Sequence, residues 1–83
     1  MTPESIREAL LDFLASNFLV ERQEIDLSKS LIDQGVIDSL GLTEISAYLG
    51  RTHGIKTEIA EMNQQNFGSV NHIVDFIIRK RAT

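Results

Sequence analysis

The stretch "DSLGLTEISAYLGRTHG" (38–54) lies at the middle of the chain and contains signals for both ends of a helix. Asp38 is a residue type that caps helix N-termini, and Gly54 is the type that most often follows a helix C-terminus. Apolar residues recur between them at the spacing of one helix face: Leu42, Ile45 and Leu49. The pattern predicts an amphipathic helix over residues 39–53, with these three side chains turned toward a core.

The opposite side of this helix is expected to face solvent. It carries Leu40, Thr43, Glu44, Ala47 and Arg51. Gly41 and Gly50 are weak helix formers, and each lowers helix stability by up to about 1 kcal/mol relative to alanine, less near an end. On propensity alone, the two glycines therefore count against the helix.

Two further segments show helical spacing. In "TPESIREALLDFLASNFL" (2–19), Thr2 is the expected cap and Pro3 the first helical residue. Its apolar stripe is Ile6, Ala9, Leu10, Phe13, Leu14 and Phe18. In "SVNHIVDFIIRK" (69–80), Ser69 is the expected cap, with Phe67 near the staple position before it. The stripe of this last helix is Val70, Ile73, Val74, Ile77 and Ile78.

The segments between the helices are less regular. Residues 21–38 lack periodicity, and a connection of that length is often functional. Its apolar residues are expected to pin it across the helical core, and Gly35 to supply a turn. "TEIAEM" (57–62) is compatible with one or two helical turns, whereas "NQQNFG" (63–68) breaks the pattern. The prediction is a single all-α domain over residues 1–83, a small four-helix bundle of three long helices and one short one, with a long first loop.

Charge and size exclude several functions. Residues 1–47 hold nine acids and three bases, whereas residues 48–83 hold three acids and five bases. The acidic front half argues against nucleic acid or an anionic membrane as the partner. The basic run "RKR" (79–81) suits the negative end of a helix dipole. A chain of 83 residues leaves little room for a deep pocket, which disfavours an enzyme.

The chain has no cysteine, so any thiol chemistry must be imported. Its two histidines, His53 and His72, are isolated and predict no metal site; each is expected to be solvated or packed. No leader or apolar run long enough to span a membrane is evident. We therefore expect a soluble cytoplasmic protein. We also expect it to be a monomer.

Ser39 allows three interpretations. Serine is common at helix starts because it satisfies free backbone donors, although Asp38 already fills the cap. A hydrolase nucleophile would need a base, an oxyanion hole and a glycine-flanked elbow, and the residue before Asp38 is Ile37. The third interpretation is attachment, because the backbone N–H groups and the dipole at a helix N-terminus favour a phosphodiester there.

The stretch "SLIDQGVIDSLGLTEISAYLGRTHGI" (30–55) resembles the core of acyl and peptidyl carrier proteins. The shared features are an apolar residue in the loop, a glycine before the motif, D-S-L, and an amphipathic helix that ends in glycine. The resemblance covers nearly the whole chain, including the short third helix and "NFGSVNHIVDFI" (66–77). D-S-L alone is weak, but at the mid-point of a short, acidic, all-helical chain it is specific.

The resemblance implies that a phosphopantetheinyl transferase moves 4′-phosphopantetheine from coenzyme A onto Ser39. The arm would supply the missing thiol, hold an acyl or aminoacyl group as a thioester, and present it to separate enzymes. Such a protein is not itself an enzyme. The resemblance also implies that Asp38 and Leu40 are read by the transferase and other partners, and that the face with Thr43, Glu44, Ala47 and Arg51 is the recognition surface. The further partners would be a cargo-loading ligase or acyltransferase and downstream biosynthetic enzymes.

Carriers of primary fatty-acid synthesis typically have a strongly acidic second helix. Here this helix offers only Glu44 and ends with Arg51 and His53. This difference favours a free-standing carrier of a specialised pathway, with an amino acid or an unusual acyl group as cargo. The alternative from another class is an unmodified helical interaction domain with a carrier-like fold. The sequence leaves open both the cargo and whether it folds into the core.

Overall fold

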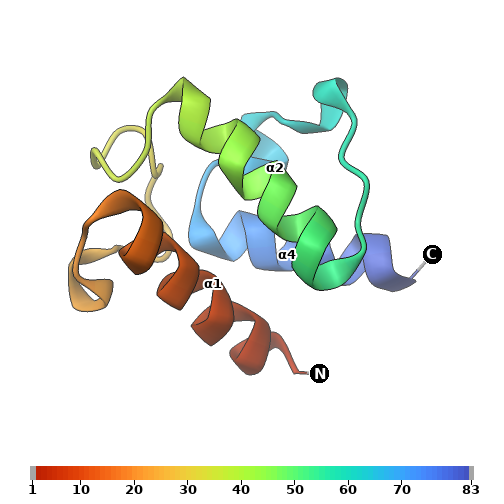
Figure 1. Cartoon of the computed structure of the whole chain (residues 1–83), viewed down its shortest axis with the longest axis horizontal. Helices are drawn as coiled ribbons and strands as arrows, with labels where there is room; N and C mark the ends of the chain where they lie inside the picture. The colour runs from red at the N-terminus through yellow and green to blue at the C-terminus, as the bar shows by residue number, and fades with distance from the viewer. Residues whose placement is uncertain (1, 83) are drawn as a thin grey trace.

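The computed structural model describes residues 2–82, and all regular structure in that range is helical. The elements are α1 (Pro3–Phe18), η1 (Arg22–Glu24), α2 (Ser39–His53), η2 (Ile59–Glu61), α3 (Gln64–Phe67) and α4 (Val70–Ala82). Figure 1 shows α1, α2 and α4 around one core, with η2 and α3 leading from the end of α2 back to α4. The predicted bundle of three long helices and one short one is confirmed.

Helix α1 begins as the sequence predicts. Thr2 accepts a hydrogen bond from the Ser5 backbone N–H, the Ser5 side chain completes a capping box, and Pro3 is the first helical residue. The predicted stripe needs one correction, since Ala9 is exposed and Leu11 is buried. Leu11 is covered because it lies beside residues of the following loop, with which it lines a shallow depression: Arg22, Gln23, Ile25 and Leu27.

Leu19 ends α1 in a left-handed conformation, with φ 56° and ψ 43°. It is the one non-glycine residue with positive φ in the described chain, and its side chain is 92% exposed. A leucine Cβ crowds the backbone in this conformation, at a cost of about 1–2 kcal/mol. No packing of the side chain compensates that cost.

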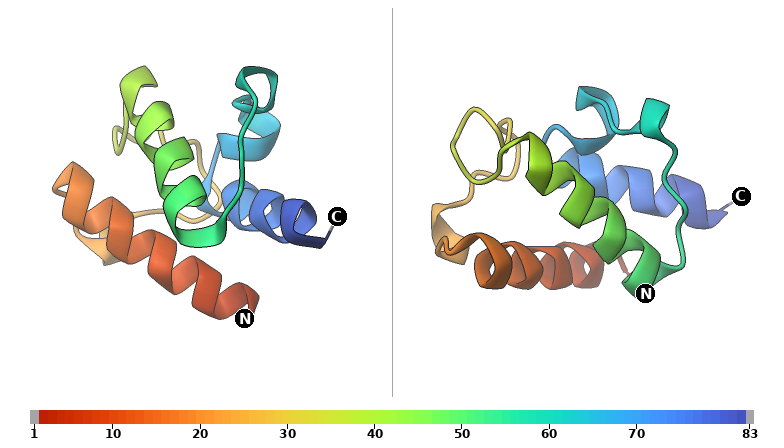
Figure 2. Two further views of the ribbon diagram at one scale, coloured as in Figure 1. Left: turned by 45° about the vertical axis from the view of Figure 1, so that its right-hand side comes forward. Right: turned by 45° about the horizontal axis from the view of Figure 1, so that its top comes forward.

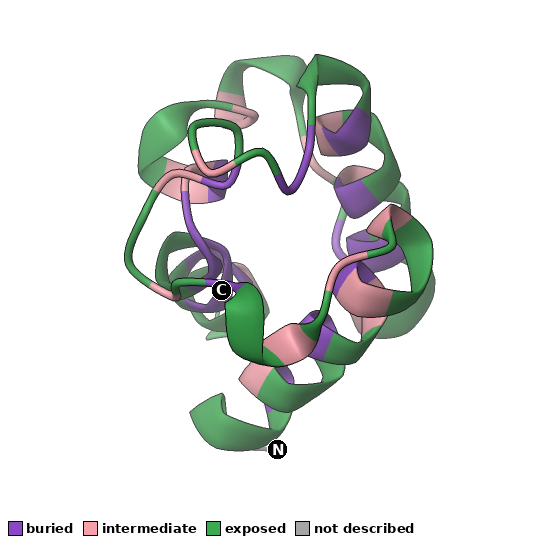
Figure 3. Ribbon diagram, turned by 90° about the vertical axis from the view of Figure 1, so that its left-hand side faces the viewer, coloured by how far each residue is buried: buried purple, intermediate pink, exposed green. Residues whose placement is uncertain are grey.

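The first loop is pinned to the core, as predicted, and Leu31 is its anchor. The Leu31 side chain is fully buried, its N–H donates to the Gly68 carbonyl at 2.8 Å, and its own carbonyl accepts from the Val36 N–H at 2.9 Å. Gly35 turns the chain between these points with φ 79°. In Figure 3 the buried parts of the loop turn toward the middle of the molecule. One predicted contact fails, because Ile32 is 45% exposed.

Helix α2 has the predicted bounds and caps. The Asp38 side chain accepts from the Gly41 N–H, and Gly54 closes the helix in a left-handed conformation. Ile45 and Leu49 are fully buried, whereas Leu42 is only partly buried. The inward face also includes Tyr48, whose ring stacks on Phe13 with centroids 4.3 Å apart, and Gly41.

The prediction that residues 63–68 are irregular is wrong. Asn63 caps the four-residue helix α3 by accepting from the Asn66 N–H, and Phe67 is buried in it. A helix of one turn is too short to show periodicity, and the packing of Phe67 against Phe76 of α4, with centroids 5.5 Å apart, holds it in place. In α4 the predicted stripe also changes, because Phe76 is buried and Ile78 is 37% exposed.

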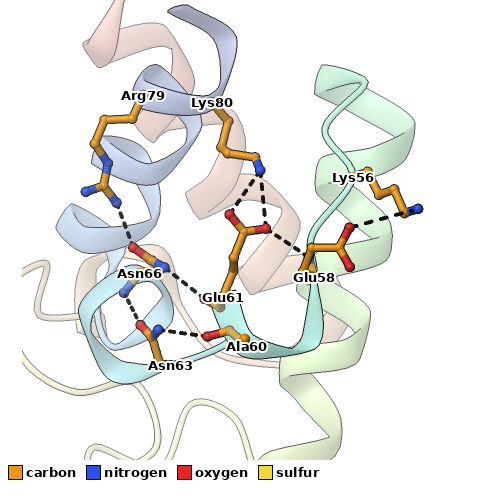
Figure 4. Close-up of polar contacts among 8 residues, drawn as sticks. All are labelled: Lys56, Glu58, Ala60, Glu61, Asn63, Asn66, Arg79 and Lys80. Atoms are coloured by element: carbon orange, nitrogen blue, oxygen red, sulfur yellow. Dashed lines mark hydrogen bonds and ion pairs between the residues drawn. The ribbon is translucent and has the colours of Figure 1, made fainter. Parts of the chain in front are cut away.

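The basic run at the end of α4 does more than suit the helix dipole. Lys80 Nζ donates to both carboxylate oxygens of Glu61, at 3.2 and 3.0 Å, and Arg79 donates to the Asn66 side chain at 2.7 Å. Figure 4 shows these contacts reaching from α4 to η2 and α3. The backbone N–H of Glu58 and the Lys80 ammonium lower the pKa of Glu61. Polar contacts therefore help fix the η2–α3 segment, since η2 itself buries no residue.

His53 at the end of α2 should make stability depend on pH. Its ring lies edge-on to Tyr48, and Arg81 donates to its Nδ1 at 3.2 Å. Partial burial, and secondly the positive charge of Arg81, lower the pKa of His53 below its ordinary value of 6.5. As the pH falls through 6.5, the unfolded chain takes up a proton before the folded chain does, so the free energy of unfolding falls.

The stability that His53 contributes is thus fully present above pH 6.5 and is lost as the pH falls toward its lower folded pKa. Urea unfolding at about pH 7.5 and about pH 5.5 should show a smaller loss of stability for His53→Gln than for the wild type. Equal losses in the two proteins would show that His53 does not couple to folding.

Candidate functional site

The start of α2 holds the residues singled out from the sequence. Asp38 is occupied by the helix itself, because its Oδ1 accepts from the Gly41 N–H at 3.0 Å. The Gly41 N–H also lies 3.0 Å from the Asp38 carbonyl oxygen, so it is shared between two acceptors. A fixed cap sets where the helix begins, and therefore where the next side chain, Ser39, leaves the surface.

Ser39 is the first residue of α2 and is exposed. Its hydroxyl makes no hydrogen bond within residues 2–82, so it is neither a cap nor part of a polar network. Ser39 begins a helix of 15 residues, and the positive end of the helix dipole lies at this N-terminus. The hydroxyl is thus accessible to a second protein and lies where an attached anionic group is electrostatically favoured.

The nucleophile interpretation finds no base near Ser39. His53 is at the other end of α2, about 21 Å along the axis at 1.5 Å per residue. His72 Nδ1 lies 2.7 Å from the hydroxyl of Ser69, at the start of a different helix. Neither histidine is placed to take the proton of the Ser39 hydroxyl, which general-base activation requires.

The predicted recognition face is exposed throughout. Leu40 is 74% exposed, directly after Ser39, and the other members are also at the surface: Thr43, Glu44, Ala47 and Arg51. Three of them, Glu44, Ala47 and Arg51, line a shallow groove together with Phe13 and Asn17 of α1. The face therefore lies partly on α2 and partly along its border with α1.

A small apolar pocket, which the sequence did not predict, lies beside α2. It has a volume of about 170 Å³, and its lining comes from the first loop, α2 and the η2–α3 segment: Ser30, Ile32, Leu42, Met62, Asn63, Gln64, Phe67 and Gly68. Leu42 is three residues after Ser39, so the two side chains are neighbours on the helix surface. The pocket therefore lies close to the start of α2. The incomplete burial of Leu42 and Ile32 is explained by this opening.

The part of the chain that runs from the end of α1 through most of α2, and includes Ser39, is acidic. Residues 19–50 contain six acids and two bases. Both bases are engaged, because Arg22 pairs with Glu8 and Asp12, and Lys29 with Asp26. The remaining acids make no ion pair with other described residues: Glu21, Glu24, Asp33, Asp38 and Glu44. Their charge is therefore available to a basic partner surface.

Residues 2–82 lack the features of two other kinds of site. No cluster of three or more histidine, aspartate or glutamate side chains is arranged to hold a metal ion there. None of the helices in that range is long and apolar enough to cross a membrane.

Comparison with known proteins gives a consistent result. The family model described as "Phosphopantetheine attachment site" matches residues 8–77. D-alanyl carrier proteins of Streptococcus pyogenes serotype M5 (strain Manfredo) and serotype M1 are each 33% identical to this chain over 70 residues, which is 84% of this chain and 87% of each relative. The matched range includes the whole of α2 with its D-S-L start.

Proposed function

Since this chain belongs to the phosphopantetheine-attachment family, whose members are carriers rather than enzymes, we propose that Ser39 is the serine that bears 4′-phosphopantetheine. The observation that carries the proposal is the exposed Ser39 hydroxyl at the first position of α2, which makes no hydrogen bond with any of residues 2–82. We further propose that residues 1–83 are one carrier domain that acts as a monomer.

The residues present fit a phosphodiester at this position. The Asp38 carboxylate, before Ser39, accepts a hydrogen bond from the Gly41 N–H. Leu40, directly after Ser39, is exposed. The N–H groups of the first helical turn that lack an intrahelical partner, together with the dipole, favour a negative group. When bound, the arm supplies the thiol that this cysteine-free chain lacks and holds the cargo as a thioester. The chain itself supplies a rigid attachment point and a surface for partners.

The cargo we propose is a small aminoacyl or short acyl group of a specialised pathway. Two relatives with 33% identity are named for carrying D-alanine. The pocket beside α2, about 170 Å³, is smaller than the roughly 300–1,000 Å³ of typical small-molecule sites, which disfavours enclosure of a long fatty chain. The proposed partners are a phosphopantetheinyl transferase, a loading ligase or acyltransferase, and the enzymes that use the cargo.

Intact-protein mass tests the attachment site. After incubation with coenzyme A, magnesium and a broad-specificity phosphopantetheinyl transferase, the wild type should gain one phosphopantetheine and Ser39→Ala none. Ser39→Ala should remain folded, because the side chain is exposed and alanine is the better helix former. Ser16→Ala, which alters an exposed serine on α1, should be modified like the wild type.

Each failure has a distinct meaning. Modification of Ser39→Ala would place the arm on another serine. An unmodified but folded wild type, with a second transferase also inactive, would favour the unmodified interaction domain.

A further inference from the structure

Leu19 combines two unfavourable features that no contact within the described residues explains. Its backbone is left-handed, with φ 56°, and its side chain is 92% exposed. Glycine relieves the crowding of Cβ at such a position, and asparagine tolerates it. The two other positive-φ residues of the described chain, Gly35 and Gly54, are glycines. A leucine here leaves a large apolar side chain on the surface at the expense of local strain.

The position of Leu19 relates it to Ser39. Its neighbour Phe18 packs beside the first turn of α2, where a Cβ added to Gly41 would lie 3.2 Å from the Phe18 ring. Figures 1 and 2 show the end of α1 and the start of α2 on the same side of the molecule, away from both termini. Leu19 and Leu40 are therefore two exposed leucines at the end of the bundle that bears Ser39.

The reaction at Ser39 indicates which partner has to bind close to the end of the bundle that bears Ser39. An enzyme that acts on the far end of a long arm can work at a distance from the protein surface. The transferase has to bring its reacting groups to the Ser39 hydroxyl itself. A specific interface covers about 800 Å² on each partner, a substantial part of the 5050 Å² that this chain exposes. An interface of that size reaches well beyond Ser39 itself, and Phe18 at the end of α1 packs beside the first turn of α2.

We propose that Leu19 is a docking residue for the transferase that modifies Ser39, with its side chain seated in an apolar pocket of that enzyme. This inference rests on the proposed function. Glu21 and Glu24, which follow Leu19 closely in the chain, make no ion pair within residues 2–82, so basic side chains beside the enzyme's pocket would match the charge next to Leu19. Leu19 supplies the apolar contact. The backbone strain in the free carrier follows from having a leucine, instead of a glycine, at this left-handed position.

The test is the rate of modification by the transferase with Leu19→Asn and Leu19→Gly. Both changes relieve the strain and remove the apolar side chain. We expect the melting temperature to rise by a few degrees while kcat/KM for modification falls about 10- to 100-fold, the range expected from losing one buried leucine. Opposite signs in the two measurements separate a docking role from damage to the fold.

Two further variants serve as controls. Leu19→Met keeps an apolar side chain and the strain, and should be modified at nearly the wild-type rate. Ile78→Ala removes a partly exposed apolar residue from the latter half of α4, away from Ser39, and should also leave the rate unchanged. A wild-type rate with Leu19→Asn would overturn the docking role while leaving the attachment at Ser39 intact. Failure to modify the wild type at all would instead overturn the proposed function.

Discussion

Replacement of Leu31 by alanine is expected to lower the free energy of unfolding by about 2–5 kcal/mol, the usual cost of truncating a fully buried leucine. Leu31 is buried although it lies in the loop, and its backbone links that loop to Gly68 beside α4. The truncation leaves a cavity near Gly68, where the loop meets the segment between α3 and α4. The surrounding elements can relax only partly into that cavity, so the lost contacts are not recovered. Urea unfolding monitored by circular dichroism measures the loss, which is a large fraction of the stability of a domain of this size.

The neighbouring residue provides a matched control. Ile32 is 45% exposed and lines the opening of the pocket beside α2, so Ile32→Ala should cost no more than about 1 kcal/mol. Because the two substitutions are adjacent in sequence, a general intolerance of the loop to truncation would affect both equally. Equal losses would show that Leu31 is not the anchor of this loop.

The elements that the sequence predicted best are those with local signals. Asp38 and Gly54 define both ends of α2, and Thr2 with Pro3 defines the start of α1. Each of these residues acts through hydrogen bonds or backbone angles within one turn of itself, which a single sequence contains in full.

The features that the sequence missed depend on contacts between distant segments. Helix α3 is a single turn held by Phe67 against Phe76, and Leu11 is buried because the loop after α1 folds over it. Neither contact leaves a periodic trace in the chain. The contacts of the basic run with Glu61 and Asn66 are likewise separated by more than ten residues. Such features can be identified only from the three-dimensional structure.

The candidate site divides in the same way. The D-S-L motif indicated Ser39 and the exposed residues of α2, because a motif and a helix period suffice for that. The apolar pocket and the exposed, left-handed Leu19 were not predicted. The pocket is assembled from three segments, and an αL conformation at a leucine contradicts the residue's own preference. An unexpected apolar residue where glycine would be favoured, directly after an amphipathic helix, is the one sequence signal that could have identified Leu19.

Gly41→Ala is expected to destabilise the protein although alanine is the better helix former. A Cβ at Gly41 would lie 2.7 Å from the Ile37 Cβ and 3.2 Å from the Phe18 ring, so α2 would have to move away from both. Overpacking of this kind costs about 1–3 kcal/mol, more than the gain in propensity of up to about 1 kcal/mol. The glycine that counted against the helix on propensity is the residue that allows α2 to approach the end of α1.

The same substitution at Gly50 should have the opposite sign. Gly50 is exposed, and the nearest atom to an added Cβ is the Ile55 carbonyl oxygen at an ordinary 3.7 Å. Gly50→Ala is therefore expected to raise the free energy of unfolding by up to about 1 kcal/mol. The two variants share a helix and a chemical change, so their difference in urea unfolding isolates the close approach at Gly41. Stabilisation by both substitutions would mean that the start of α2 is free to shift, and Ser39 would then lack the fixed position that the Asp38 cap and the Gly41 contact give it.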